Sequence, residues 1–241
     1  MKQILQGKNC LITGSTGGLG KEIAREFAKN GCNLFLTGRN IEKLNSLKDE
    51  LEKNQIKIDF QQADLSDTDE IQKLFEKVKS TFSSIDILVN CAGVFPVKLL
   101  SDSTIDDFEK CFSVNVKAAF LLCKEFSQGM ISKKWGRIVN IASSSAYAGF
   151  KNTSVYCSSK HALLGLSRSL HSELREHNVR TFCVSPGPIK TSMGHDIIKN
   201  ENPDERFDSF MNPDEIAEFI VYLISFDNEM VSEEIRLSRI D

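Results

Sequence analysis

The stretch Thr13-Gly14-Ser15-Thr16-Gly17-Gly18-Leu19-Gly20 joins a short apolar run, residues 10–13, to a segment of helical character, residues 21–30. Glycines in such a turn let the backbone approach a pyrophosphate, which then lies at the positive end of the following helix. The alternative interpretation is a glycine-rich turn between a strand and a helix that binds nothing. The position of the turn after the first strand of the chain favours a phosphate site.

Five further apolar runs follow the first one, with segments of helical period between them. The predicted strands are residues 10–13, 32–37, 57–62, 86–90, 136–142 and 180–185. Most are continuous apolar runs, which is typical of parallel strands covered by helices on both faces. The alternation predicts an α/β fold: a single doubly wound (Rossmann) parallel sheet of about seven strands, with helices on both faces, in one domain over residues 1–241. The polar segment 190–211 interrupts the alternation and is expected to form a substrate loop.

The last predicted helix has a well-marked start. Asn212 is a suitable capping residue, Pro213 suits the first helical position, and Glu215 stands where a capping-box acid belongs. The stripe expected to face the core of the protein is formed by Ile216, Phe219, Ile220 and Leu223.

Composition excludes several classes of protein. Lys and Arg number 30 against 33 Asp and Glu, so the net charge is -3, and neither nucleic acid nor an anionic membrane is an expected partner. The seven cysteines contain no C-x-x-C pair, and no Cys, His and acid cluster has metal-ligand spacing. No apolar run approaches the roughly 18 residues of a membrane span. The expectation is a cytoplasmic protein without a metal site.

A tyrosine and a lysine stand one helical turn apart, at Tyr156 and Lys160. Free tyrosine has a pKa near about 10, so it is a poor acid–base catalyst unless a neighbouring cation lowers that value. Alone, such a pair is usually an ordinary helix start. Here the predicted strand 136–142 ends in a run of serines, Ser143 to Ser145, and active sites of open α/β sheets lie beyond the carboxyl ends of strands.

Six ordered motifs resemble those of the short-chain dehydrogenase/reductase family, over roughly residues 5 to 225. They are Thr13 to Gly20, Asp64 in Ala-Asp-Leu, Asn90-Cys91-Ala92-Gly93, Asn115 in Ser-Val-Asn-Val, Tyr156 to Lys160 with Ser143 thirteen residues earlier, and Pro186-Gly187 followed by Thr191. The resemblance implies hydride transfer between a nicotinamide and a carbonyl or alcohol carbon.

The resemblance also implies a role for each catalytic residue. Tyr156 is the general acid toward the carbonyl oxygen, and Lys160 lowers the pKa of that tyrosine and holds the nicotinamide ribose. Ser143 polarises the carbonyl, and Asn115 holds a water of a proton relay behind Lys160. No metal is needed, because hydroxyl groups stabilise the developing alkoxide. The expected cofactor-binding residues are Gly14, Ser15, Thr16, Gly18, Leu19, Gly20, Arg39, Asp64, Leu65, Asn90, Ala92, Gly93, Tyr156, Lys160, Pro186, Gly187, Ile189 and Thr191.

The residues after the second predicted strand bear on the choice of cofactor. NAD enzymes of this architecture usually place an acid there to bind the ribose hydroxyls; this chain has Gly38, followed by Arg39. A guanidinium can bind the additional 2′-phosphate of NADP(H), so NADP(H) is the predicted cofactor and Gly38→Asp is expected to favour NADH. The alternative is that Arg39 is a solvated loop residue or stacks on the adenine.

The expected substrate is a small-molecule or acyl-carrier-bound carbonyl compound, since the chain most resembles 3-oxoacyl-(acyl-carrier-protein) reductases. An NAD-dependent alcohol, sugar or steroid dehydrogenase is the alternative enzyme, and a non-catalytic dinucleotide-binding protein is the alternative class. Leu164 lies outside the main leucine stripe of its helix, and the segment 118–126 is apolar on more than one side. A second apolar face suggests burial against another subunit, so a homodimer or homotetramer is expected.

Overall fold

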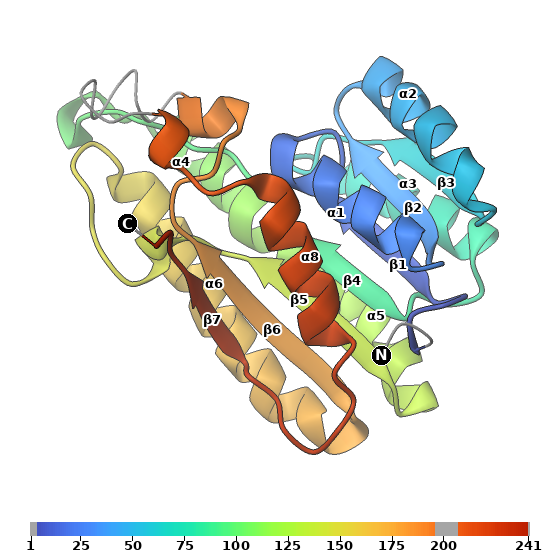
Figure 1. Cartoon of the computed structure of the whole chain (residues 1–241). Helices are drawn as coiled ribbons and strands as arrows, with labels where there is room; N and C mark the ends of the chain where they lie inside the picture. The colour runs from blue at the N-terminus through green and yellow to red at the C-terminus, as the bar shows by residue number, and fades with distance from the viewer. Residues whose placement is uncertain (1–3, 196–206, 241) are drawn as a thin grey trace.

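A parallel sheet with the strand order β3-β2-β1-β4-β5-β6-β7 organises the molecule, as the computed structural model shows for residues 4–195 and 207–240 (Figure 1). The chain passes from β1 outward to β3 and then returns to place β4 on the other side of β1. Ligands of open α/β sheets bind beside such a reversal of strand order. The strands are β1 Asn9–Thr13, β2 Asn33–Gly38, β3 Ile58–Gln62, β4 Ile87–Asn90, β5 Gly136–Ile141, β6 Val179–Pro186 and β7 Glu234–Leu237.

Helices cover both faces of the sheet, so the doubly wound α/β fold is confirmed. They are α1 Gly18–Lys29, α2 Ile41–Leu51, α3 Thr68–Thr81, α4 Ile105–Phe112, α5 Ala118–Lys133, α6 Ser154–Leu174 and α8 Pro213–Ile224. Successive strand residues point to opposite faces, so Ile12 packs in the apolar core that includes α1, α2 and α8. Its neighbour Leu11 packs in the core that includes α3 and α5. One domain over residues 1–241 stays a prediction.

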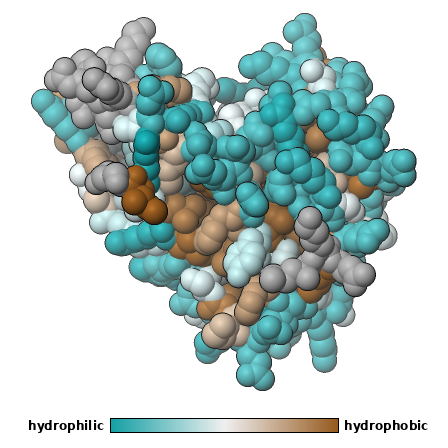
Figure 2. Space-filling view, viewed as in Figure 1, coloured by the Kyte–Doolittle hydropathy of each residue, from teal (hydrophilic) through white to brown (hydrophobic). Residues whose placement is uncertain are grey.

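The helix α8 begins at the predicted place, and its buried face includes Ile216 and Ile220 of the predicted stripe. Its buried side chains are Ile216, Ala217, Ile220, Val221 and Ile224. Phe219, predicted to face the core, is 37% exposed. The Asn212 side chain makes no cap hydrogen bond and instead donates from Nδ2 to Glu215 Oε1 at 3.1 Å. The apolar residues exposed on α8 form part of the apolar surface at the centre of Figure 2.

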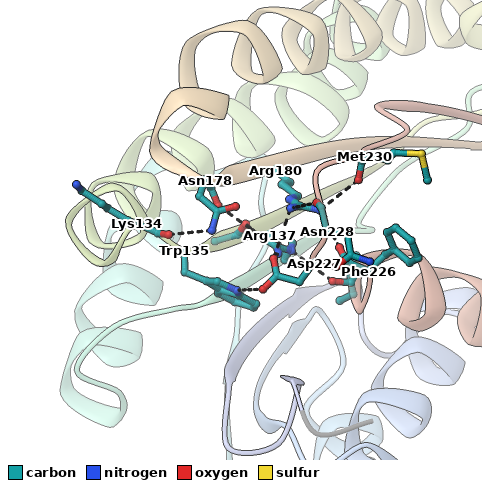
Figure 3. Close-up of polar contacts among 11 residues, drawn as sticks. Lys134, Trp135, Arg137, Asn178, Arg180, Phe226, Asp227, Asn228 and Met230 are labelled. Carbon is teal, nitrogen blue, oxygen red and sulfur yellow. Dashed lines mark hydrogen bonds and ion pairs between the residues drawn. The ribbon is translucent and has the colours of Figure 1, made fainter. Parts of the chain in front are cut away.

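A buried arginine ties the connection after α8 to the amino ends of β5 and β6 (Figure 3). Arg137 is fully buried, pairs with Asp227, and donates to the carbonyl oxygens of Gly136 and Ile224. Its guanidinium also lies 4.4 Å from the ring centroid of Trp135. This cluster lies at the end of the sheet opposite the carboxyl ends, and it secures the chain that leads into β7.

The predicted substrate loop 190–211 is described only at its two ends. Lys190 N donates to Met211 O at 2.9 Å, which brings these ends together beside β6. Residues 196–206 of the predicted loop lie outside the described residues. Among the helices that the structure describes, none is long and apolar enough to cross a bilayer.

Candidate active site

A cavity of about 820 Å³ opens at the carboxyl ends of the central strands. The glycine turn after β1 lines one part of it, and residues after β5 and on α6 line another. The predicted site residues that line it are Gly14, Thr16, Gly18, Leu19, Gly20, Arg39, Asp64, Leu65, Ala92, Gly93, Ser143, Tyr156, Lys160, Pro186, Gly187, Ile189 and Thr191. One cavity therefore brings together residues that are far apart in the sequence.

The glycine turn is bound to the segment after β4 by the Thr13 hydroxyl. Thr13 Oγ1 accepts hydrogen bonds from the backbone N–H groups of Cys91 and Ala92, both at 3.0 Å. Gly14 has φ +64°, and a Cβ at this position would lie 2.8 Å from Ala92 Cα. Only glycine satisfies both conditions, so the two motifs form a single wall of the cavity.

The amino end of α1 is suited to an anion. Gly17 is its N-cap residue and supplies no side-chain cap, and the first turn contains no acidic residue. Unpaired N–H groups at a helix start and the helix dipole favour a negatively charged ligand. Gly17, Gly18 and Leu19 all line the cavity, so these residues fit the pyrophosphate of a dinucleotide.

Tyr156 and Lys160 lie in the first two turns of α6, and both are buried. Lys160 Nζ donates to Ile141 O at 2.8 Å and lies 5.7 Å from the centroid of the Tyr156 ring. Burial lowers the pKa of Lys160 to about 8. The edge of the Phe95 ring packs against Tyr156, with the ring centroids 4.5 Å apart.

The tyrosine differs from the sequence expectation in its pKa. Burial raises the pKa of Tyr156 to about 12, and the Ser143 hydroxyl acts in the opposite direction. The expected lowering by Lys160 is not part of this balance. Desolvation dominates because a buried phenolate loses its hydration. Tyr156 is therefore a protonated acid at neutral pH.

The serine run after β5 forms a short turn, Ser144–Ala146, that begins at Ser143. Ser143 Oγ accepts a hydrogen bond from Ser145 N at 3.1 Å. All three serines line the cavity. Of these, Ser143 is the one whose hydroxyl lowers the pKa of Tyr156.

Asn115 lies in a π-helical turn, Ser113–Lys117, between α4 and α5. Its Oδ1 accepts from Val94 N at 2.9 Å, and its Nδ2 donates to Val94 O and to Ser159 Oγ. A Cβ on Gly93 would lie 3.4 Å from Asn115 Oδ1 and 3.7 Å from Lys160 Nζ. Asn115 is thus behind the cavity wall, on the side of Lys160.

Two other predicted residues also lie outside the cavity lining. Ser15 is fully buried, and its Oγ donates to Thr37 O at 3.1 Å. Asn90 Nδ2 donates to Asn140 Oδ1 at 2.8 Å. These side chains hold β1 against β2 and β4 against β5, so they shape the cavity from behind.

Sequence analysis missed a cation beside the end of β2. Lys43, on the first turn of α2, lines the cavity together with Arg39. Asn40 Oδ1 accepts from Lys43 N at 2.8 Å, which caps α2 and fixes its start. The signal in the sequence is Asn40, a typical helix-capping residue directly after Arg39. A helix that starts there places its third residue, Lys43, near the end of β2. Asp64 also lines the cavity and accepts from Ser66 N and Oγ.

The fold and this cavity define a dinucleotide-binding oxidoreductase: a glycine turn beside the reversal of strand order, with a buried tyrosine, lysine and serine across the same cavity. A family model described as short chain dehydrogenase matches residues 8–202. The chain belongs to this family, as its motifs predict.

Two curated relatives are 3-oxoacyl-(acyl-carrier-protein) reductases named FabG. That of Aquifex aeolicus (strain VF5) is 34% identical over 226 residues, which are 92% of this chain and 91% of that protein. That of Rickettsia typhi (strain ATCC VR-144 / Wilmington) is 37% identical over 187 residues, 78% of this chain and 75% of that protein. The L-sorbose reductase of Gluconobacter frateurii, solved with NADPH and L-sorbose, superposes with TM-score 0.88 at 27% identity, covering 97% of this chain and 96% of that one.

Proposed function

We propose that this enzyme reduces a ketone carbonyl to a secondary alcohol with NADPH, and that the ketone is a 3-oxoacyl thioester or a similar compound. The observation that carries the proposal is the division of one cavity into two chemically distinct parts. Tyr156, Lys160 and Ser143 line one part, and the glycine turn with Arg39 and Lys43 lines the other. The names of the curated relatives support the substrate class.

NADPH supplies the hydride when bound. Tyr156, neutral because burial raises its pKa, donates its proton to the carbonyl oxygen. Ser143 donates a hydrogen bond to the same oxygen and so stabilises the developing negative charge. Lys160 passes a proton toward Tyr156, and Asn115 anchors the wall behind Lys160 through its two bonds to Val94.

The preference for NADPH is supported by the charge at the end of β2. Arg39 and Lys43 line the cavity there, and the residue at the strand end is Gly38 rather than an acid. Two cations can pair with a 2′-phosphate of about two negative charges, whereas a carboxylate at this place would repel it. Solved relatives named as complexes with NADP or NADPH agree with this assignment.

The proposal is tested by kcat/KM for a 3-oxoacyl thioester, a ketose and a steroid ketone, each with NADPH and with NADH. We expect the thioester with NADPH to be the best pair by at least about 10-fold. Better turnover of the ketose or steroid, or a preference for NADH, would instead support the alternative dehydrogenases. Dinucleotide binding without turnover of any ketone would support a non-catalytic protein. Tyr156→Phe measured in parallel controls for contaminating reductases.

We also propose that the enzyme is a cytoplasmic homodimer or homotetramer. The reason differs from the one expected, because Leu164 and most apolar residues of 118–126 are buried within their own chain. Exposed apolar side chains are found instead around α4 and α5 and on α8, among them Leu100, Ile105, Phe108, Phe120, Phe219 and Tyr222. Exposed apolar groups of this size are typical of surfaces that bind another protein.

A further inference from the structure

We infer that Thr16 and Gly38 form a steric pair that keeps an acidic side chain away from the end of β2. The inference deepens the proposed NADPH preference and rests on it. Thr16 in the glycine turn packs against Gly38 and so excludes an acidic side chain at position 38. An acid at this position is therefore expected to act only if Thr16 is changed as well. Thr16 is thereby a residue that determines cofactor specificity.

In the Thr16 rotamer that is present, the distances at this contact leave no room for a side chain on Gly38. A Cβ on Gly38 would lie 2.7 Å from Thr16 Oγ1, 3.3 Å from its Cγ2 and 3.5 Å from its Cβ. Non-bonded heavy atoms pack best at about 3.5–4.0 Å. Gly38 is not in the left-handed region of backbone conformation, so space rather than backbone strain is what requires glycine here.

Rotation of Thr16 only partly relieves the contact. Threonine carries two heavy atoms on Cβ, and both now face Gly38 at 2.7 and 3.3 Å. Among the three staggered rotamers, one heavy atom therefore always remains in one of these two places. The best rotamer still leaves a contact of 3.3 Å, and a carboxylate beyond the new Cβ needs additional space.

The backbone cannot separate the two residues either. Ser15 N and Ser15 Oγ both donate to Thr37 O at 3.1 Å, so the glycine turn is bonded to β2 one residue before Gly38. On the other side, Ala63 N donates to Gly38 O at 3.1 Å. Thr37 and Ser15 are fully buried. Moving Gly38 away from Thr16 would break buried hydrogen bonds, which is costly.

The chemical consequence concerns the ribose of the cofactor. A carboxylate at position 38 could accept hydrogen bonds from ribose hydroxyls. A hydrogen bond to a charged acceptor raises affinity by about 10- to 150-fold. That gain requires the carboxylate to reach its position undistorted. With Thr16 in place, Gly38→Asp is expected to lose NADPH affinity by charge repulsion without gaining NADH affinity. The sequence alone suggested that Gly38→Asp would favour NADH, whereas with Thr16 in place only the loss of NADPH affinity is expected.

The test is a double-mutant cycle in which the dissociation constants of NADH and NADPH are measured by calorimetry. The proteins are wild type, Gly38→Asp, Thr16→Ala, and the double variant. Thr16→Ala removes Oγ1 and Cγ2 and leaves Cβ at an ordinary distance of 3.5 Å. We expect either single change to alter NADH affinity by less than about 3-fold, and the double change to raise it by at least about 10-fold.

Equal NADH affinity of Gly38→Asp and the double variant would overturn the inference, and so would a double variant that gains none. Gly38→Ala separates space from charge: it should lower the melting temperature, and Thr16→Ala should restore it. If the melting temperature of Gly38→Ala equals that of wild type, the contact is not restrictive and the inference fails. A wild type that prefers NADH would refute the proposed NADPH preference but not the steric pair. The coupling between positions 16 and 38 is measured from NADH binding and does not depend on that preference.

Discussion

At the scale of single residues, burial shifts the pKa values of Tyr156 and Lys160 in opposite directions. The pKa of Tyr156 is raised to about 12, and the pKa of Lys160 is lowered to about 8, in both cases mainly by desolvation. Each shift favours the neutral form, as expected for groups taken out of water. The neutral phenol of Tyr156 can donate a proton to a carbonyl oxygen that is being reduced. The amine of Lys160 changes its protonation within the working range of pH.

This predicts the pH dependence of ketone reduction. A lysine with pKa about 8 is protonated at pH 7 and loses its proton as the pH rises through 8, whereas Tyr156 keeps its own until about 12. We expect kcat/KM for NADPH, which reports on the free enzyme, to fall above about pH 8. Lys160→Met should show a low rate without this limb. A profile that stays level to pH 10 in wild type would contradict the role given to Lys160.

The three serines are predicted to behave differently when each is replaced by alanine. Ser143→Ala removes the hydroxyl that acts on the pKa of Tyr156, so kcat should fall by roughly 10²-fold or more, as for loss of an oxyanion donor. Ser144→Ala is the matched control and should change mainly KM. Steady-state kinetics with a saturating ketone distinguish the two. A larger loss of kcat at Ser144 would mean that the reacting oxygen lies elsewhere.

At the scale of elements, the connection from α8 to β7 depends on a charged pair. The buried Arg137 guanidinium is balanced by Asp227, whose side chain is 31% exposed. Removing one partner of a buried pair leaves an uncompensated charge, so Asp227→Ala should lower the free energy of unfolding by roughly 2–3 kcal/mol, less than for a fully buried pair. Urea unfolding measures this difference.

The control for that experiment is Glu26→Gln, at the surface pair of Glu26 with Lys29. An exposed pair contributes at most about 1 kcal/mol, so this variant should unfold close to wild type. If Asp227→Ala is no less stable than Glu26→Gln, Arg137 is satisfied by its carbonyl partners alone. The proposed anchoring of the connection to β7 would then be wrong.

The elements also show where sequence patterns suffice. The strands β2 and β6 appear within one residue of their predicted ends, because continuous apolar runs between helices leave few alternatives. The strand β7, Glu234–Leu237, was not predicted, since it is short and carries charged side chains at an edge of the sheet. The face of α8 was misjudged at Phe219, because amphipathicity does not show which of two apolar sides packs on α1.

At the scale of the whole molecule, the sequence motifs predicted residues that share one cavity, but not how burial shifts their pKa values. Motif spacing identified Tyr156, Lys160 and Ser143, which line one cavity. The pKa of Tyr156 depends on burial, and the contact of Thr16 with Gly38 joins the turn after β1 to the end of β2. Neither follows from spacing, because both are set by packing between distant segments.

The exposed apolar side chains predict assembly of whole molecules. Phe120 is 48% exposed on α5, and Ile105 is 68% exposed on α4. We expect light scattering at micromolar concentration to give the mass of a dimer or tetramer. Phe120→Lys should weaken that assembly, while Lys29→Ala on α1, which replaces an exposed charged side chain, should not. A strictly monomeric wild type would refute the proposed assembly.

The most direct test of the proposed function is Tyr156→Phe, which removes the proton donor and leaves the ring that packs on Phe95. The measurement is kcat/KM for a 3-oxoacyl thioester with NADPH, together with the dissociation constant of NADPH. We predict a loss of 10²- to 10⁴-fold in kcat/KM, about the contribution of a general acid, with NADPH affinity changed by less than about 3-fold. A variant that retains more than about half of the wild-type rate, with chemistry limiting, would contradict the assignment of Tyr156 as the acid.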